Sequence, residues 1–231
     1  MGVDVRLSTY ADAALVEAEA PEVVVIATGS LPRMDGVQFG LPGVPACGTR
    51  LPHVMSSHDL LLGPQQDEVR HALVLDDTGH LEAAAVAEYL VAKGAAVTFV
   101  TRHAMMTPYI ETTLRTVPIL ERLYRGNFTL LVRHQLVAIV EGRAIVRPTQ
   151  SESEREVLAD LVVLVTPNAP LRDLYDEVRH THPRVWIVGD AHAPRDLQTA
   201  IAEGHRTVRA GLAQLSTDAR QTKCRRAAPT S

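Results

Sequence analysis

Three runs rich in apolar and β-branched residues are predicted to form buried strands. They occupy residues 23–30, 159–166 and 185–190 and show no regular alternation with polar residues. A run of this kind is typical of a strand covered on both faces, as in a parallel sheet. We therefore expect an α/β fold with a buried parallel sheet.

The segment from residue 72 to residue 101 has the pattern of one βαβ unit. A predicted strand at 72–75 leads to a predicted helix at 81–93, and Gly94 stands where a helix commonly stops. A second strand follows at 97–101. Such a unit takes about 30 residues, and its crossover is right-handed.

Shorter β-like runs follow a further predicted helix at 112–124. They lie at 129–133, 136–140 and 144–147, with Glu141-Gly142 as a turn. Their close spacing predicts a small antiparallel meander. In contrast, residues 31–53 are too rich in Pro and Gly for a central strand or a helix, so we expect a crossing linker there.

Composition and charge narrow the range of partners. The chain of 231 residues has 46% hydrophobic residues and a net charge of -4, so it has no basic surplus to attract nucleic acid or anionic lipid. No apolar run reaches the ~20 residues of a membrane helix, and the start lacks a signal peptide. We expect a cytoplasmic protein with neither nucleic acid nor membrane as its main partner.

The two cysteines, Cys47 and Cys224, do not support a metal centre. They form no CxxC pair and cannot supply the four thiolates of an iron-sulfur cluster or a structural zinc site. We therefore expect no metal site.

The ends of the first and last predicted strands carry candidate binding residues. The sequence "ATGS" at 27–30 and the pair Gly189-Asp190 follow these strands, and open α/β sheets bind ligands at this edge. Gly189 permits close approach of a ligand, and Asp190 can accept a hydrogen bond from a ribityl or ribose hydroxyl. The helix that begins near Arg195 or Asp196 would direct N–H groups to the same edge.

The βαβ unit departs from the glycine pattern of nucleotide-binding loops. A GxGxxG frame that starts at Asp76 places Thr78 and Leu81 at the other two glycine positions, and Gly79 falls out of frame. The carboxylates of Asp76 and Asp77 would use the field of the helix and repel a phosphate. This unit is therefore predicted to keep its fold and to lose ordinary NAD binding.

Arg102 leaves an alternative open. It follows the second strand of the unit, where a basic residue can meet the 2'-phosphate of NADP. A solvated arginine at the strand end is the other interpretation.

The order of these motifs resembles a known family. The segments "VVVIATGS", "SSHDLL", "LDDTGHLEA", "VTFVTRH", "LVTPN" and "VGDAHAPRDLQTAIAEGH" are similar to the C-terminal region of the large old yellow enzyme-class NADH:flavin oxidoreductases, over residues 1–213. That group includes 2,4-dienoyl-CoA reductase, trimethylamine dehydrogenase and histamine dehydrogenase. The resemblance implies a Rossmann-like flavoprotein with two dinucleotide-binding domains.

The resemblance also implies cofactor contacts. For an FAD or ADP site it implies the turn after the first strand, the end of the last strand and the start of the last helix: Thr28, Gly29, Gly189, Asp190, Leu197 and Gln198. The degenerate NAD(P)-like site would comprise Asp76, Thr78, Gly79 and Arg102. No catalytic residue is assigned.

The domain organisation follows from the same resemblance. We expect a partial FAD-binding-like domain from residues 1–62 and 180–214, an NAD(P)-binding-like domain at 69–170 and a disordered tail at 215–231. The barrel of the large reductases and their first Gly-rich fingerprint do not precede residue 1, so the architecture is expected to be N-terminally truncated.

Two functions remain open at this point. The first is an oxidoreductase module completed by a barrel-containing flavoprotein subunit. The second is a noncatalytic scaffold or interaction module, or a truncated remnant, that has lost cofactor binding and could form a homo-oligomer.

Overall fold

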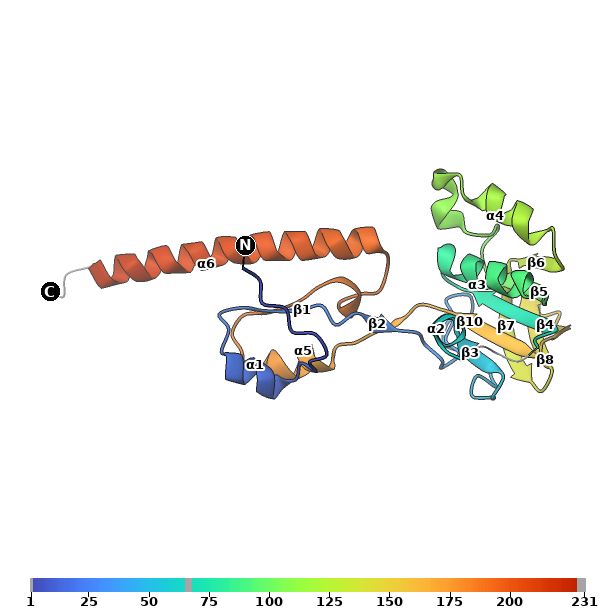
Figure 1. The fold of residues 1–231 in the computed structure, drawn as a ribbon, viewed down its shortest axis with the longest axis horizontal. Coiled ribbons are helices and arrows are strands. Elements are labelled where there is room, and N and C mark those ends of the chain that lie inside the picture. Colours follow the sequence, from blue (N-terminus) through green and yellow to red (C-terminus); the bar gives the residue numbers. More distant parts are fainter. Residues whose placement is uncertain (1, 65–67, 228–231) are drawn as a thin grey trace. The chain divides into compact units, whose positions relative to one another are not determined.

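The chain consists of two structural units (Figure 1). The computed structural model describes residues 2–64 and 68–227. Unit 1 is formed by the two ends of the chain and unit 2 by its middle, with the bounds Met1–Leu31 and Ala169–Ser231 for unit 1 and Pro32–Asn168 for unit 2.

Unit 2 is built on a five-stranded parallel sheet with the strand order β3-β10-β4-β5-β6. The strands are β3 (Val54–Ser56), β4 (His71–Asp76), β5 (Ala96–Thr101), β6 (Phe128–Val132) and β10 (Leu161–Val165). Residues 32–62 were expected in the first domain, but the structure includes them in unit 2, because β3 pairs in parallel with β10. The expected α/β fold with a buried parallel sheet is confirmed.

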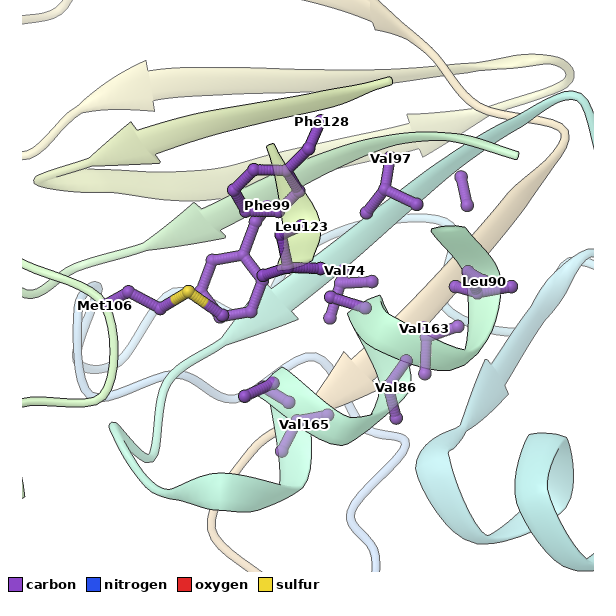
Figure 2. Close-up of a cluster of buried hydrophobic side chains, with 14 of the residues drawn as sticks. Val74, Val86, Leu90, Val97, Phe99, Met106, Leu123, Phe128, Val163 and Val165 are labelled. Carbon is purple, nitrogen blue, oxygen red and sulfur yellow. The ribbon is translucent and has the colours of Figure 1, made fainter. Parts of the chain in front are cut away.

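Each central strand of unit 2 is buried on both faces. Along β4, Ala72 and Val74 pack into one hydrophobic cluster, whereas Leu73 and Leu75 pack into a second cluster on the other face. Figure 2 shows the first cluster, in which Phe99 meets side chains from the sheet and from the covering helices. This double burial explains why the strands appear in the sequence as continuous apolar runs.

Helices cover the face of the sheet that carries Phe99. Helix α3 (Leu81–Ala92) follows β4 and is rich in alanine, the best helix former. It ends before Gly94, whose φ of 91° is the left-handed conformation that favours glycine. The helix expected at 112–124 is divided into a 3-10 segment, η1 (Pro108–Thr113), and α4 (Thr116–Leu123).

A three-stranded antiparallel sheet covers the other face of unit 2. It consists of β7 (His134–Val140), β8 (Arg143–Pro148) and β9 (Arg155–Leu158). The turn at Glu141-Gly142 is confirmed, since β7 pairs with β8 in antiparallel register. The prediction was wrong for residues 129–133, because β6 extends the parallel sheet by pairing with β5.

The described residues of unit 1 form two small strand pairs and three α-helices. The parallel pair is β1 (Val24–Ile26) with β12 (Val185–Ile187), and the antiparallel pair is β2 (Ser30–Leu31) with β11 (Ala169–Pro170). The helices are α1 (Ala13–Glu19), α5 (Asp173–Val178) and α6 (Leu197–Ala227), and a 3-10 turn, η2 (Gly189–Ala191), follows β12.

Helix α6 is longer than the sequence pattern indicated. It continues to Ala227, through most of the segment for which a disordered tail was expected, and residues 228–231 lie outside the described part of the chain. Its Gly211 lies against the indole of Trp186, where a Cβ atom would overlap the ring. In the described part of the chain, no helix combines the length and the hydropathy needed to cross a bilayer.

Candidate functional site

The carboxyl ends of β1 and β12 lie side by side in unit 1. The two strands are parallel, with Ile26 opposite Ile187, and the N–H of Val188 donates to the carbonyl of Ile26 at 2.9 Å. The loops that follow these strands therefore start from the same edge. This edge carries four of the residues predicted for the FAD-like site: Thr28, Gly29, Gly189 and Asp190.

Both glycines of this edge have backbone angles that other residues rarely adopt. The φ angles are 81° for Gly29 and 62° for Gly189. A Cβ at Gly29 would meet open space, whereas a Cβ at Gly189 would lie 3.3 Å from that of Ala200 in α6. Gly29 thus leaves room for a ligand, and Gly189 lets the start of α6 approach the strand end.

The loop around Gly29 is held by the segment that begins at β11. The hydroxyl of Thr28 donates to the carbonyl of Leu171 at 2.6 Å, and the N–H of Leu171 donates to the carbonyl of Gly29 at 3.0 Å. These two hydrogen bonds fix the backbone of the turn. The side chain of Thr28 is therefore engaged in the fold, although the residue is exposed.

The carboxylate of Asp190 retains acceptor capacity. It is half-buried and accepts hydrogen bonds from the hydroxyl of Ser30 at 3.5 Å and from the N–H of Arg195 at 3.4 Å. Both distances are at the long end of the hydrogen-bond range, and a carboxylate has about four lone-pair sites. A ligand hydroxyl at this edge would find an acceptor.

The start of α6 is organised by a capping carboxylate. Asp196 accepts hydrogen bonds from the N–H of Thr199 at 2.7 Å and from its hydroxyl at 3.0 Å. Leu197 and Gln198 form the first turn beside this cap, and both are exposed. The two predicted contacts at the helix start therefore lie on an accessible surface of unit 1.

A second carboxylate, Glu203, braces the end of β12 from α6. It accepts the N–H of Gly189 at 3.0 Å and pairs with Arg195 and His192. Burial acts to raise the pKa of Glu203, but the hydrogen bonds from Arg195 and Gly189 and the Arg195 charge lower it overall. No sequence motif marks Glu203, because only the fold brings it to Gly189.

In unit 2, Asp76 closes the turn that follows β4. Its buried carboxylate accepts the N–H of Thr78 at 3.2 Å and its hydroxyl at 3.1 Å, the N–H of Gly79 at 2.8 Å and the hydroxyl of Thr101 at 3.2 Å. The N–H groups of Thr78 and Gly79 are the backbone donors that a phosphate would need at this turn. The protein therefore fills this position with its own carboxylate.

The neighbouring Asp77 holds a different part of unit 2. Its carboxylate accepts the N–H groups of Phe39 at 2.5 Å and Gly40 at 3.2 Å, and it lies 3.0 Å from Nε of Arg102. Arg102 also donates to the carbonyl of Asp77 and lies over the ring of Phe39. Arg102 is thus engaged by the fold, and neither alternative foresaw an internal partner for it.

Burial dominates the titration of this edge. It raises the pKa of Asp76 and of Asp77 above the ordinary carboxyl value, although the hydrogen bonds to both groups act in the opposite direction. Burial also lowers the pKa of His103, with a smaller contribution from the charge of Arg102.

Aromatic rings lie around Gly79. The ring of Tyr109 stacks on that of His80 at 5.1 Å and meets that of His103 edge-on at 5.5 Å. A Cβ at Gly79 would lie 2.8 Å from Nε2 of His103 and 2.9 Å from Cδ2 of Tyr109. Sequence reasoning missed this cluster, because its members come from three separate segments.

The predicted residues therefore assemble at two separate edges. Unit 1 carries the FAD-like set at the carboxyl ends of β1 and β12 and in the first turn of α6, and unit 2 carries the NAD(P)-like set after the carboxyl ends of β4 and β5. Two grooves of about 240 Å³ and 280 Å³ lie at the opposite, amino ends of the unit 2 strands. Because ligands of open α/β sheets bind at carboxyl ends, we assign no function to these grooves. The described residues include no group of three or more side chains suited to a metal ion.

Comparison with known proteins points to oxidoreductases. No protein-family model matches the sequence. A probable N-methylproline demethylase of Rhizobium meliloti (strain 1021) is 30% identical over 183 residues, which make up 78% of this chain and 25% of that protein.

Solved structures extend this likeness. The 6-hydroxypseudooxynicotine amine oxidase HisD from Pseudomonas geniculata N1 matches 87% of this chain with a TM-score of 0.81 and 27% identity. Histamine dehydrogenase from Rhizobium sp. 4-9 matches 86% with a TM-score of 0.79 and 25% identity. The chain spans 30% of the length of each.

The fold itself extends to a more distant protein. The flavoprotein disulfide reductase RclA from Escherichia coli has a TM-score of 0.58 and 17% identity, which is a likeness of fold alone. The match with histamine dehydrogenase agrees with the resemblance seen in the sequence motifs. The chain is thus similar to part of several oxidoreductases. It spans 25% of the length of the demethylase and 30% of the length of HisD and of histamine dehydrogenase.

Proposed function

We propose that this chain is the nucleotide-binding part of a flavin-dependent oxidoreductase, in which unit 1 holds FAD or ADP. The observation that carries the proposal is the parallel pairing of β1 with β12, which brings two positive-φ glycines and Asp190 to one edge. This is the edge at which open α/β sheets bind nucleotides. The oxidoreductases with similar structures support the reaction class.

The residues present fit such a nucleotide. The open space beside Gly29 allows close approach to the backbone, and Asp190 offers an acceptor to a ribityl or ribose hydroxyl. Leu197 and Gln198 lie in the exposed first turn of α6, where N–H groups favour the electron-rich end of a flavin ring. FAD supplies electron-transfer chemistry when bound, whereas this chain supplies binding and orientation.

Unit 2 has a supporting role in this proposal. The donors at its carboxyl edge are occupied by Asp76 and Asp77, and Arg102 is paired with Asp77. Ordinary NAD(P) binding would require breaking these contacts. A pyridine nucleotide site in unit 2 is therefore the less favoured alternative.

The site that transforms the substrate would lie outside this chain. The chain covers 25% of the demethylase and 30% each of HisD and histamine dehydrogenase, so a barrel-containing flavoprotein subunit, or further sequence, would supply the remaining machinery. A pull-down with the full chain should recover a barrel flavoprotein if a separate subunit does so. A stable homodimer without cofactor would instead favour a noncatalytic scaffold.

The test is a titration of the purified chain with FAD and with ADP, followed by flavin fluorescence and calorimetry. Asp190→Asn should weaken binding by about tenfold or more, because a hydrogen bond from a ligand hydroxyl to a carboxylate is stronger than one to an amide oxygen. Glu177→Gln, an exposed charge change in the same unit, is the matched control and should leave affinity unchanged. Absence of binding of both ligands to the unaltered chain would contradict the proposal.

A further inference from the structure

Several donors from distant segments of unit 2 converge on the carboxylate of Asp77. The residue is 2% exposed, and its partners are the N–H groups of Phe39 and Gly40 and the guanidinium of Arg102. Consecutive backbone N–H groups together with an arginine are the donor set that proteins use for phosphate. The position is therefore chemically a cradle for an anion.

We propose that Asp77 is a built-in anion, which occupies a phosphate-type cradle and holds residues 36–48, here called the strap, on the carboxyl edge of unit 2. In this role the side chain closes unit 2 to phosphate-bearing nucleotides. Removal of the carboxylate turns the cradle into a binding site for small anions such as acetate or inorganic phosphate.

Asp76 and Asp77 differ in what they hold. The donors to Asp76 come from its own turn and from Thr101 on the adjacent strand. The backbone donors to Asp77 come from residues 37 and 38 positions away in the sequence. Asp76 therefore stabilises a local turn, whereas Asp77 joins two distant segments of the chain.

The cation of the cradle is held by contacts other than the carboxylate. Nε of Arg102 donates to the carbonyl of Asp77 at 3.2 Å, and the guanidinium carbon lies 5.6 Å from the ring centre of Phe39. A Cβ at Gly40 would lie 3.2 Å from Cβ of Arg102, so the strap packs closely on the base of this side chain. These contacts keep the guanidinium in place when the carboxylate is removed.

The strap is also anchored at two further points. The buried amide of Gln38 donates to the carbonyl of Leu136 at 2.7 Å and accepts its N–H at 3.1 Å. The N–H of Cys47 donates to Val137 at 3.2 Å, and that of Ile139 donates to Cys47 at 2.8 Å. The strap therefore remains over the edge without Asp77, and its two free N–H groups then face the vacated position.

The first test uses the full chain with Asp77→Ala. Its thermal unfolding midpoint is measured against rising sodium acetate or sodium phosphate, with sodium chloride as the control at equal ionic strength. We expect the variant to melt below the wild type and to be stabilised by acetate or phosphate in a saturable way, since an anion bound only to the folded state raises the midpoint. The wild type and the double variant Asp77→Ala/Arg102→Gln should show no saturable rise. An equal response in all three proteins, or none in Asp77→Ala, would overturn the proposal.

A second test uses Asp77→Asn, which keeps the size of the side chain. Hydrogen exchange at the amides of Phe39 and Gly40 should become about tenfold faster or more, because a charged acceptor is replaced by a neutral one. Glu141→Gln, an exposed change in the same unit, should leave both rates unchanged. Unaltered exchange in Asp77→Asn would also overturn the role of this carboxylate.

Discussion

The two carboxyl edges of this molecule use acidic residues in opposite ways. In unit 1 the carboxylate of Asp190 is half-buried and has two long hydrogen bonds, beside a glycine with open space. In unit 2 the carboxylates of Asp76 and Asp77 are buried. Asp76 accepts four hydrogen bonds, and Asp77 accepts two and forms an ion pair with Arg102. The edge of unit 1 presents a hydrogen-bond acceptor to a ligand, whereas the N–H donors at the edge of unit 2 are already bound to the protein's own carboxylates.

This difference shows that the two edges can share a fold and still differ in their capacity to bind a nucleotide. Both edges are formed by parallel strands followed by loops and helices, the arrangement that elsewhere receives nucleotides. Which edge can bind depends on a few side chains at the strand ends. A nucleotide-type fold is therefore weak support for nucleotide binding until its donors and acceptors have been accounted for.

The largest expected effect tests whether the two units respond separately. Phe99→Ala removes a fully buried ring from the core of unit 2 and should lower its free energy of unfolding by about 3–5 kcal/mol. Urea unfolding monitored by hydrogen exchange of unit 2 amides measures this loss, and Val117→Ala on the exposed side of α4 is the control. Affinity of unit 1 for FAD or ADP should change by less than about twofold. A loss of affinity as large as that of Asp190→Asn would abolish the contrast between the edges.

An intermediate effect compares two carboxylates directly. Asp76→Ala leaves the buried N–H of Gly79 and the hydroxyl of Thr101 without their acceptor, so the free energy of unfolding should fall by about 2–4 kcal/mol. Asp190→Ala should cost less than about 0.5 kcal/mol, since its contacts are long and half exposed. Chemical denaturation of both variants gives the comparison.

The matched change Asp76→Asn sharpens this comparison. It keeps an acceptor oxygen and removes a charge that burial disfavours, as the raised pKa of Asp76 indicates. It should therefore be milder than Asp76→Ala. Equal losses for Asp76→Ala and Asp190→Ala would show that both acids serve only the fold.

The smallest effect is a pH dependence specific to unit 2. Burial, the charge of Arg102 and the nearby His80 lower the pKa of His103 in the folded protein, against the opposing charge of Asp76, whereas the unfolded chain titrates near 6.5. Below that pH the unfolded state therefore binds more protons, and stability falls as pH decreases toward the folded pKa.

His103→Gln should make this decline shallower in the interval just below pH 6.5. Thermal unfolding of the two proteins across pH 5 to 7.5 measures the difference, and His58→Gln, an exposed histidine of the same unit, is the control. Asp76 and Asp77 act with the opposite sign, because their raised pKa values make folding more favourable as pH falls. A steeper decline in His103→Gln than in the wild type would contradict the assignment.

Local pattern was sufficient for the elements of the core. The strand, helix and strand expected at 72–75, 81–93 and 97–101 are confirmed as β4, α3 and β5, because each is determined by burial periodicity and by a stop such as Gly94. Partner choice was harder. Residues 129–133 read as a strand in either sheet, and only the crossover through α4 brings them beside β5.

The internal partners of the candidate sites were beyond a reading of local pattern. Repulsion of phosphate by Asp76 and Asp77 follows from charge alone, but the contact of Asp77 with Phe39 and Gly40 joins a Pro/Gly-rich loop to a distant strand end. Glu203 likewise reaches Gly189 only because α6 turns back to β12. Such contacts depend on the path of the whole chain, and the spacing of residues along the sequence does not predict them.

The packing of Gly211 on Trp186 gives the molecule a natural optical label. Trp186 is the one tryptophan of the 231-residue sequence. Its half-buried indole extends from β12 and packs against Gly211 of α6. Indole emission therefore originates in unit 1, whereas unit 2 contributes tyrosine and phenylalanine signals. Excitation near the red edge of tryptophan absorption would follow the parting of α6 from β12 without an attached dye.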